Sequence, residues 1–368
     1  MNSKILAGIG AAIAIGIIVT IIGMGDFGTN TAPVVNNSND KLGLVINTPQ
    51  SSITLQELDE IYQKAASSGI GRSNVYMFWN MIEPEREQYD WKQYDRVMAF
   101  NEKNNLKVTL YFSVINGKTL GPFPDWIGNP SLKSISEDNL VNVLDSVLSR
   151  YHIVDSVIIS AGTDEHFRYQ EQEIPVFEEL FNNVYDKIKE KHPDIKLGNS
   201  FELHNTLNKN LEDTVKQLSF GDFVAFTYLP TDTLNEIDKT PAEAILDLEK
   251  LKEIIPDKKI AIFEISWATS ELVEGSTEDQ TQFIKELYNF YKVNEQDIEF
   301  LTWYRLYDRP DGTCEIDESK IEGTVTLGNS TFVIERLGNY ICSAGLLTVD
   351  SNEKSGWNEL SNEIKSLT

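Results

Sequence analysis

Short apolar runs rich in β-branched residues alternate with amphipathic runs from residue 42 onward, and this alternation constrains the fold most strongly. Apolar runs of this length, bounded by polar residues, are typical of buried parallel strands. The amphipathic runs place apolar residues every three or four positions, which indicates helices that cover such strands. The predicted strands are residues 42–47, 74–79, 107–115, 155–162, 195–200, 223–229, 259–266 and 298–304.

Amphipathic segments lie between these strands and predict the covering helices. Strict alternation of strand and helix implies a parallel sheet, and eight units within residues 42–368 suit a closed (β/α)8 TIM barrel. An open doubly wound sheet is the alternative, but it usually carries a glycine-rich loop after its first strand, and residues 47–52 contain no glycine. The predicted helices are residues 54–68, 90–104, 136–151, 174–191, 207–218, 241–255 and 277–293.

The N-terminal segment from Ile5 to Met24 contains 20 residues without a charge, which is the length of a membrane-spanning helix. Lys4 and the N-terminal amine precede it, so the positive-inside rule leaves residues 1–4 in the cytoplasm and the remainder outside. A cleaved signal peptide is the competing interpretation, but its apolar region is usually shorter. We predict a signal anchor at residues 5–24, a polar stalk at residues 25–41 and the barrel at residues 42–368.

Composition excludes some functions. The net charge is −25, with 57 acidic and 32 basic residues, which disfavours binding to nucleic acid phosphates. The only cysteines, Cys314 and Cys342, could form a disulfide outside the cell or remain two thiols. The four histidines are scattered along the sequence. We therefore expect no metal site and no cofactor, and we expect a monomer.

Two glutamates stand where barrel enzymes carry their reacting groups, at the C-terminal ends of strands. Glu264 interrupts the apolar strand 259–266, where a charge is costly unless it serves a purpose. Glu165 follows strand 155–162 closely. Aromatic residues end several other strands, and sugar rings stack on aromatic faces. The arrangement indicates sugar chemistry, which needs one protonated and one ionised carboxyl group.

Residues 78–97, with a Trp, a Glu-Pro and a Tyr-Asp-Trp, and residues 345–360, with Gly-Leu, a Lys and a Trp, resemble the second and last units of the clan A retaining barrel glycosidases. This clan includes endo-β-1,4-galactanases, β-galactosidases and cellulase-like enzymes. The resemblance implies that Glu165 is the acid/base and Glu264 the nucleophile.

The resemblance also implies substrate contacts. Tyr228 would hydrogen-bond the nucleophile, Trp303 would form the floor of the sugar subsite, and Trp79 and Asn80 would line the pocket. His166, Asp164 and Trp267 are further candidates for substrate binding, although Trp267 could equally be a packing residue.

Two positions depart from the pattern of the clan. Asp164 stands where the clan has Asn before the acid/base, and it could instead cap the following helix. Tyr76 stands where the clan often has an Arg on strand two that steadies the nucleophile; Arg72 is a poor substitute, and Arg305 could compensate.

The expected function is therefore a membrane-anchored, extracytoplasmic retaining glycosidase that cleaves O-glycosidic bonds of a polysaccharide or glycan. The alternative is a non-catalytic barrel that binds glycans at the cell surface, for which the two departures are the main support.

Overall fold

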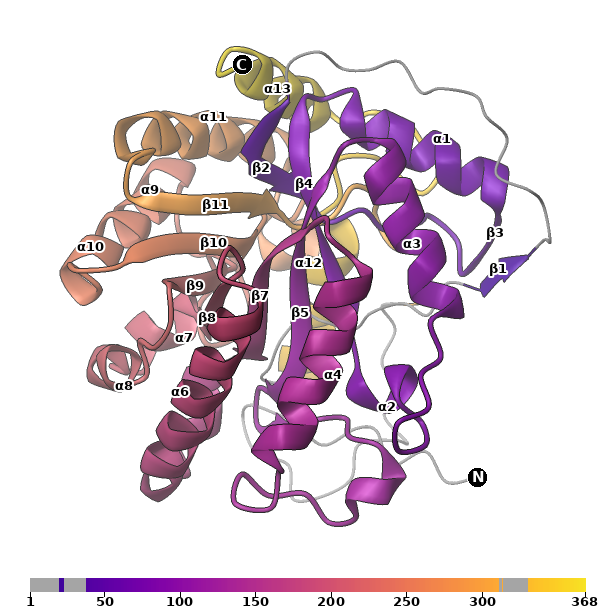
Figure 1. The fold of residues 1–368 in the computed structure, drawn as a ribbon. Helices are drawn as coiled ribbons and strands as arrows, with labels where there is room; N and C mark the ends of the chain where they lie inside the picture. The colour runs from indigo at the N-terminus through magenta and orange to yellow at the C-terminus, as the bar shows by residue number, and fades with distance from the viewer. Residues whose placement is uncertain (1–19, 23–37, 311–312, 314–329) are drawn as a thin grey trace.

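A computed structural model describes residues 20–22, 38–310, 313 and 330–368 of the chain. Eight parallel strands stand at the centre with helices around them (Figure 1). The predicted (β/α)8 barrel is thereby confirmed. Its strands are β2 (Asn39–Leu44), β4 (Ile70–Met77), β5 (Lys107–Asn116), β7 (Val154–Ala161), β8 (Lys196–Glu202), β9 (Phe223–Tyr228), β10 (Lys259–Ile265) and β11 (Ile298–Trp303).

The sheet closes on itself because the last barrel strand pairs with the first. β11 and β2 are parallel, in a register that runs from Leu301 opposite Leu42 to Trp303 opposite Leu44. β4 pairs with both β2 and β5, which completes the ring. A short strand, β6 (Thr119–Leu120), adds antiparallel to the end of β5.

The helices follow the predicted segments with some differences. The predicted helix 207–218 is two helices, because Asn210 adopts a left-handed φ of 54° that ends the first one. The predicted helix 241–255 is also two helices, and α2, α5, α12 and α13 lie outside the predicted helical segments. The helices are α1 (Leu55–Ala66), α2 (Trp79–Ile82), α3 (Lys92–Lys103), α4 (Glu137–Arg150), α5 (Thr163–Phe167), α6 (Ile174–Lys191), α7 (Leu203–Asn208), α8 (Glu212–Gln217), α9 (Pro241–Glu249), α10 (Leu251–Ile254), α11 (Thr277–Asn294), α12 (Thr331–Ser343) and α13 (Ser355–Lys365).

Alternation along each strand divides the apolar core into two parts. Phe223 and Ala225 belong to a small cluster inside the ring of strands, whereas Val224 and Phe226 belong to the large cluster between strands and helices. The small cluster fills the barrel interior with side chains, which leaves the C-terminal ends of the strands as the place for a site. Its buried members are Tyr111, Ile158, Ala161, Phe223, Ala225, Ala261, Phe263 and Phe300.

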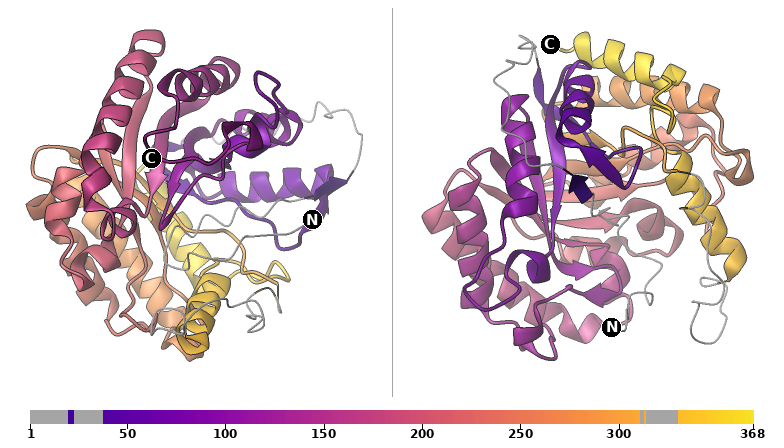
Figure 2. Two further views of the ribbon diagram at one scale, coloured as in Figure 1. Left: turned by 90° about the horizontal axis from the view of Figure 1, so that it is seen from below. Right: turned by 90° about the vertical axis from the view of Figure 1, so that its right-hand side faces the viewer.

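The last helix of the chain completes the helical layer. Figure 2 shows α13 lying beside α11, and the Lys292 ammonium and Glu363 carboxylate join the two helices at 2.7 Å. Lys354, just before α13, donates to Asp308 at 2.8 Å, to Thr269 at 2.9 Å and to the Ser343 carbonyl at 3.0 Å. The lysine of the C-terminal motif thus holds the last unit against the barrel.

The predicted membrane helix at residues 5–24 is not found in the described part of the chain, where no helix is both long and apolar enough to cross a bilayer. Thr20–Ile22, which fall within this segment, form strand β1 and pair parallel with β3 (Ser52–Thr54). The other residues of the segment, and residues 25–37 of the stalk, lie outside the described residues. Cys342 is disulfide-bonded, as one of the two alternatives expected, whereas Cys314 lies outside the described residues.

Candidate active site

A β-bulge positions Glu264 at the end of β10. Ile262 lies opposite Phe226 of β9, but Glu264 lies opposite Thr227, so Phe263 is the extra residue. The Phe263 ring contacts the Tyr76 ring, with centroids 6.1 Å apart, and the Glu264 carboxylate accepts a hydrogen bond from the Tyr76 hydroxyl. A bulge that turns two successive side chains toward the same tyrosine is a common device beside active sites.

The interior of the barrel supports this bulge. The Asn74 amide donates to the Phe263 carbonyl at 2.8 Å, and its oxygen accepts from the Thr302 hydroxyl at 3.3 Å. Asn74, Phe263 and Thr302 are all buried. The Phe263 carbonyl, which the bulge takes out of the strand pairing, thus has a fixed hydrogen-bond partner.

Glu264 is buried, and burial raises its pKa to about 7, against the opposing effects of the Tyr76 hydrogen bond and the Arg305 charge. The pKa of Tyr76 is raised well above its ordinary value by burial and by Glu264, so its hydroxyl remains a donor. Arg305 follows β11 with a left-handed φ of 76°, and its guanidinium donates to the Tyr304 hydroxyl at 2.9 Å. Tyr76 and Arg305 thus stabilise the charged form of Glu264 that a nucleophile requires.

Glu165 lies on the short helix α5, directly after β7. The chain turns at Gly162, whose φ of 61° favours glycine and where a Cβ would lie 3.0 Å from the Cα of Gly117. The Thr163 hydroxyl donates to Ser160 at 2.8 Å and lies 2.9 Å from the Ser200 carbonyl, which ties the start of α5 to β8. The turn therefore holds Glu165 at the C-terminal end of the barrel.

Three cations contact the Glu165 carboxylate, which is itself almost fully buried. Lys118 Nζ lies 3.1 Å from Oε1, Lys209 Nζ lies 3.0 Å from Oε2, and Arg168 Nη1 lies 4.0 Å from Oε2. Both carboxylate oxygens are thus engaged by ammonium groups. These cations are missing from the residues predicted for the site, because each lies on a loop or at the end of a short helix, where no sequence pattern marks it.

Asp164 is buried beside Glu165. Its Oδ1 accepts from the Glu202 amide at 3.0 Å, and its Oδ2 accepts from the Thr206 hydroxyl at 3.5 Å. Burial raises its pKa to about 7; the Glu165 charge adds to this effect, whereas the hydrogen bond from Glu202 and the Lys209 charge oppose it. The alternative that Asp164 caps the helix is wrong, because Gly162 is the N-cap residue of α5.

The strand register connects the two halves of the site. Glu202 of β8 lies opposite Thr227 of β9, and Thr227 lies opposite Glu264 of β10. Glu202 accepts a hydrogen bond from the Asn205 amide, and through its own backbone amide it contacts Asp164. Residues that lie side by side on β8, β9 and β10 therefore connect Asp164 with Glu264.

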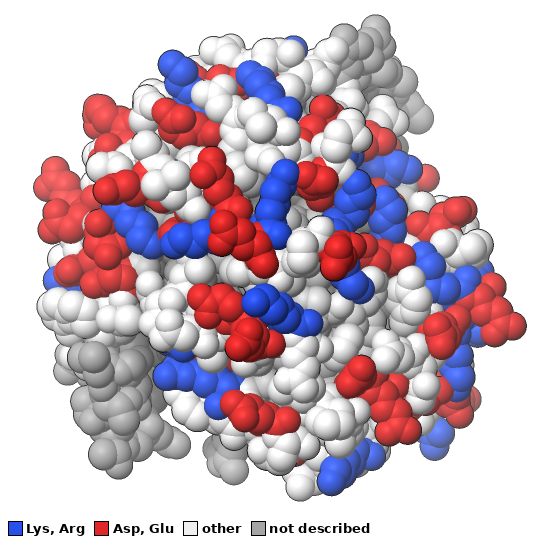
Figure 3. Space-filling view, turned by 90° about the vertical axis from the view of Figure 1, so that its left-hand side faces the viewer, with Lys and Arg blue, Asp and Glu red and all other residues white. Residues whose placement is uncertain are grey.

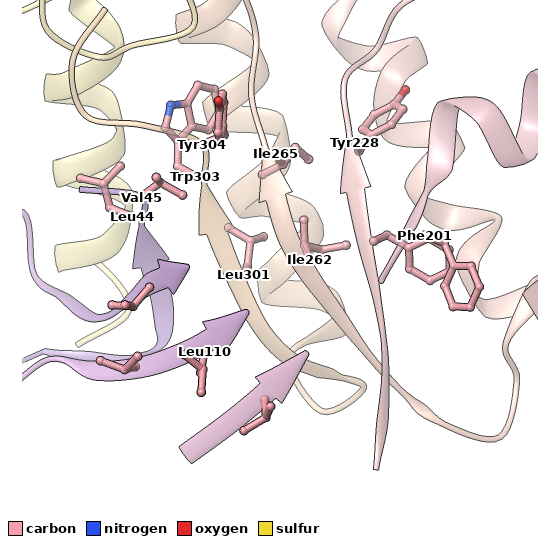
Figure 4. Packing of buried hydrophobic residues seen from close by; sticks show 14 of the residues in the cluster. Leu44, Val45, Leu110, Phe201, Tyr228, Ile262, Ile265, Leu301, Trp303 and Tyr304 are labelled. Carbon is pink, nitrogen blue, oxygen red and sulfur yellow. The ribbon is translucent and has the colours of Figure 1, made fainter. Parts of the chain in front are cut away.

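The predicted aromatic contacts lie elsewhere than the resemblance implies. The Tyr228 hydroxyl donates to Asp247 on α9 at 2.8 Å, whereas the tyrosine that donates to Glu264 is Tyr76, so the predicted hydrogen bond from Tyr228 to Glu264 is wrong. Trp303 is buried against Phe283 of α11, with ring centroids 6.3 Å apart, and its role as the floor of a sugar subsite stays a prediction. Figure 4 shows Trp303 and Tyr304 where β11 ends, with Tyr228 at the end of β9.

Two further tryptophans also pack inside the protein. Trp267 is buried, and its ring centroid lies 5.0 Å from that of Phe283. This agrees with the alternative that Trp267 is a packing residue. Trp79 is buried between Phe112, Phe123 and Trp126, and its indole donates to Glu83 at 2.8 Å.

The remaining candidates differ in exposure. Asn80, in α2, is exposed. His166 is buried beside Phe167, and burial lowers its pKa, so it is neutral at pH 7. Among the described residues, neither side chain has a hydrogen bond or ion pair with Glu165 or Glu264, and their substrate contacts stay predictions.

Arg72, considered as a partner for the nucleophile, lies at the opposite end of the barrel. It forms a bidentate pair with Asp155 at the start of β7, at 3.2 and 3.0 Å, and stacks over Phe300. It is therefore a structural residue of the barrel bottom. Within the described residues no group of three side chains is arranged to hold a metal ion.

Comparison with known proteins finds one partial family match and several solved structures with a similar fold. A family model described as glycosyl hydrolase family 42, beta-galactosidase, matches residues 49–130. This match contains Trp79 and Asn80 but neither glutamate, so it does not test their roles. A search of curated protein sequences finds no match.

Solved structures with the same fold include several glycoside hydrolases. A GH5_18 protein from Bifidobacterium longum, in complex with Manβ1-4GlcNAc, has a TM-score of 0.65 at 10% identity, covering 89% of this chain and 78% of that one. A GH5_18 protein from Streptomyces cattleya, in complex with the same disaccharide, has a TM-score of 0.62 at 12% identity, covering 89% and 81%. A family 39 glycoside hydrolase from Bacteroides cellulosilyticus has a TM-score of 0.57 at 15% identity, covering 90% and 64%. The chain thus shares the (β/α)8-barrel fold of these glycoside hydrolases, and one segment of it matches a beta-galactosidase family model.

Proposed function

We propose that the chain is a retaining glycosidase in which Glu264 is the nucleophile and Glu165 the acid/base. The observation that carries the proposal is the burial of these two carboxyl groups at the C-terminal ends of the seventh and fourth barrel strands, each with its own fixed polar partners. Burial of carboxylates at this end of a barrel is costly and is typical of catalytic groups.

In the first step the Glu264 carboxylate attacks the anomeric carbon while the bond from that carbon to the glycosidic oxygen breaks. The leaving oxygen takes the proton of Glu165, and a glycosyl-enzyme ester forms. In the second step Glu165 removes a proton from water, the water oxygen attacks the anomeric carbon, and the bond to Glu264 breaks. Tyr76 and Arg305 favour the charged Glu264 that starts the first step and leaves in the second.

The roles can be tested with a panel of aryl glycosides and polysaccharides and the purified full-length protein. Glu264→Gln should abolish turnover, with a loss of about 10³-fold or more. A 2-fluoro glycoside that is turned over slowly should leave a covalent adduct on Glu264, detectable by peptide mass spectrometry. The control is Glu190→Gln, which changes an exposed glutamate on α6.

An unchanged rate in Glu264→Gln on a confirmed substrate would reject the assignment. Glycans that bind without turnover, across the whole panel, would favour the alternative of a non-catalytic glycan-binding barrel. A product whose anomeric configuration is opposite to that of the substrate would reject the retaining mechanism while it left the glycosidase class intact.

We further propose that residues 5–24 attach the enzyme to the cell membrane with the barrel on the outer side; Thr20–Ile22, which pair with β3 in the structure, would leave that strand when the segment enters the bilayer. Support comes from the 20 uncharged residues that follow Lys4 and from the disulfide at Cys342, which suits an oxidising compartment. Full-length protein should sediment with membranes, and deletion of residues 1–24 should release it to the soluble fraction. Equal sedimentation of the two forms would overturn the anchor.

A further inference from the structure

Three cations converge on one carboxylate from different loops. Lys118 comes from the connection between β5 and β6, Arg168 directly follows α5, and Lys209 directly follows α7. The nitrogen atoms lie 3.1, 4.0 and 3.0 Å from the Glu165 oxygens, respectively. None of the three cations contacts a second carboxylate within 4.0 Å among the residues that the structure describes.

This excess of positive charge is unusual in a chain with a net charge of −25. On the face shown in Figure 3, Lys and Arg lie interleaved with Asp and Glu across the described surface. Lys187, for example, lies between Glu137 and Asp138. At Glu165 the ratio of basic to acidic groups is the opposite, because three positive groups contact one carboxylate.

Two further buried carboxyl groups, those of Asp164 and Glu202, lie beside α5. The pKa of Asp164 is about 7, so at neutral pH this residue carries only part of a negative charge. At the start of α7, burial is the main cause that lowers the pKa of His204 to about 3, with smaller contributions from the charges of Lys209 and Lys239, and the Glu202 carboxylate lies 3.9 Å from its imidazole. The cations create a positive region at the acid/base end of the site.

The exposure of these side chains shows where a ligand could meet them. Glu165 is 2% exposed, whereas Lys118 is 42%, Arg168 35% and Lys209 23% exposed. The cations thus cover the carboxylate on its solvent side, and their flexible stems allow the ammonium groups to turn toward an arriving group.

We infer, on the basis of the proposed glycosidase function, that the substrate carries an anionic sugar, with a carboxylate or a sulfate ester, next to the cleaved bond. With a neutral sugar the two lysines keep both oxygens of Glu165 engaged, and the glycosidic oxygen has no free partner there. An anionic group gives Lys118 and Lys209 a second partner, which leaves an oxygen of Glu165 free to take up a proton and donate it to the glycosidic oxygen.

The inference can be tested by binding, independently of turnover. Glu264→Gln protein is titrated by calorimetry with matched pairs: 4-nitrophenyl β-glucuronide and β-glucoside, β-galacturonide and β-galactoside, and 6-sulfo-β-galactoside and β-galactoside. A second set compares β-glucosyl-glucuronic acid with cellobiose, which places the charge on the leaving sugar. The same pairs are assayed for turnover with the unmodified protein.

We expect the anionic member of at least one pair to bind and react about tenfold better or more. The uronide and sulfate arms distinguish the two sources of the charge. In a Lys118→Gln, Lys209→Gln double variant the preference should fall below about threefold, whereas Lys118→Arg should keep it. The control is Lys187→Gln, which changes a lysine of equal exposure, 42%, on α6 and should leave the preference intact.

Equal affinities within every pair, or an unchanged preference in the double variant, would overturn the inference. Turnover of neutral glycosides with no preference for acidic ones would overturn it while the glycosidase proposal stood. Binding of anionic sugars that the lysine variants weaken, without turnover of any glycoside, would support the inference and reject the glycosidase proposal.

Discussion

The Tyr76 hydroxyl on β4 donates a hydrogen bond to the Glu264 carboxylate on β10, across two intervening strands of the barrel. The clan often has an arginine at this function. Here the tyrosine supplies a neutral donor, and the positive charge comes instead from Arg305 after β11. The departure noted at Tyr76 is therefore a different way of holding the same carboxylate.

Tyr76→Phe should lower kcat/KM about tenfold at neutral pH, because the hydrogen bond favours charged Glu264 and its loss raises the pKa of that carboxyl group. The acidic limb of the pH–rate profile should move up by about one pH unit. Tyr185→Phe removes another tyrosine–carboxylate hydrogen bond, to Asp222 at 2.9 Å, away from the site. It should leave the limb in place, and an unmoved limb in Tyr76→Phe would contradict the role of Tyr76.

Glu264→Gln should stabilise the protein at neutral and higher pH. The pKa of Glu264 is raised from 4.5 to about 7 by burial, so the folded state holds the proton more tightly than the unfolded state. Its contribution to folding stability is therefore present below pH 4.5 and is lost as the pH rises to about 7. The glutamine does not titrate, so the free energy of unfolding of the variant relative to the unmodified protein should grow by about 3 kcal/mol across this window.

Urea denaturation at a series of pH values measures this difference. Glu190→Gln, which changes an exposed residue on α6, serves as the control and should not reproduce the rise. A stability difference that stays flat from pH 4 to pH 8 would mean that Glu264 is solvated in the folded protein.

Asp164→Ala should destabilise the fold by about 1–3 kcal/mol, because it leaves the buried Glu202 amide without its acceptor. Asp164→Asn keeps a side-chain oxygen that can accept this hydrogen bond, so it should cost clearly less. Thermal and urea unfolding of the two variants provide the measurement. Equal losses would show that the contact to Glu202 contributes little.

Arg72→Met should lower stability by about 2 kcal/mol, because it leaves partly exposed Asp155 without its bidentate partner. Arg72 lies near the N-terminal end of β4, away from the site, so kcat for a confirmed substrate should change less than about twofold. A large loss of kcat in a folded Arg72→Met protein would mean that the two ends of the barrel are coupled.

Much of the architecture is predictable from local pattern. The strand that contains Glu264 is predicted at residues 259–266, and it runs over Lys259–Ile265 in the structure. The prediction succeeds because a short apolar run with β-branched residues is typical of a buried parallel strand. The segment 207–218 is predicted as one helix because its apolar spacing continues through the break, whereas the left-handed Asn210 divides it. The backbone conformation of one asparagine is not fixed by apolar periodicity.

The barrel and the two glutamates at its C-terminal end can be predicted from the sequence alone, because a charged residue within or directly after an apolar run stands out in the linear sequence. The partners of those glutamates emerge only when the chain is folded. Tyr76 meets Glu264 through a bulge and the closure of the ring, and Lys118 and Lys209 meet Glu165 from loops 47 and 44 residues away in the chain. Such contacts depend on how distant segments pack together, and no local periodicity encodes them.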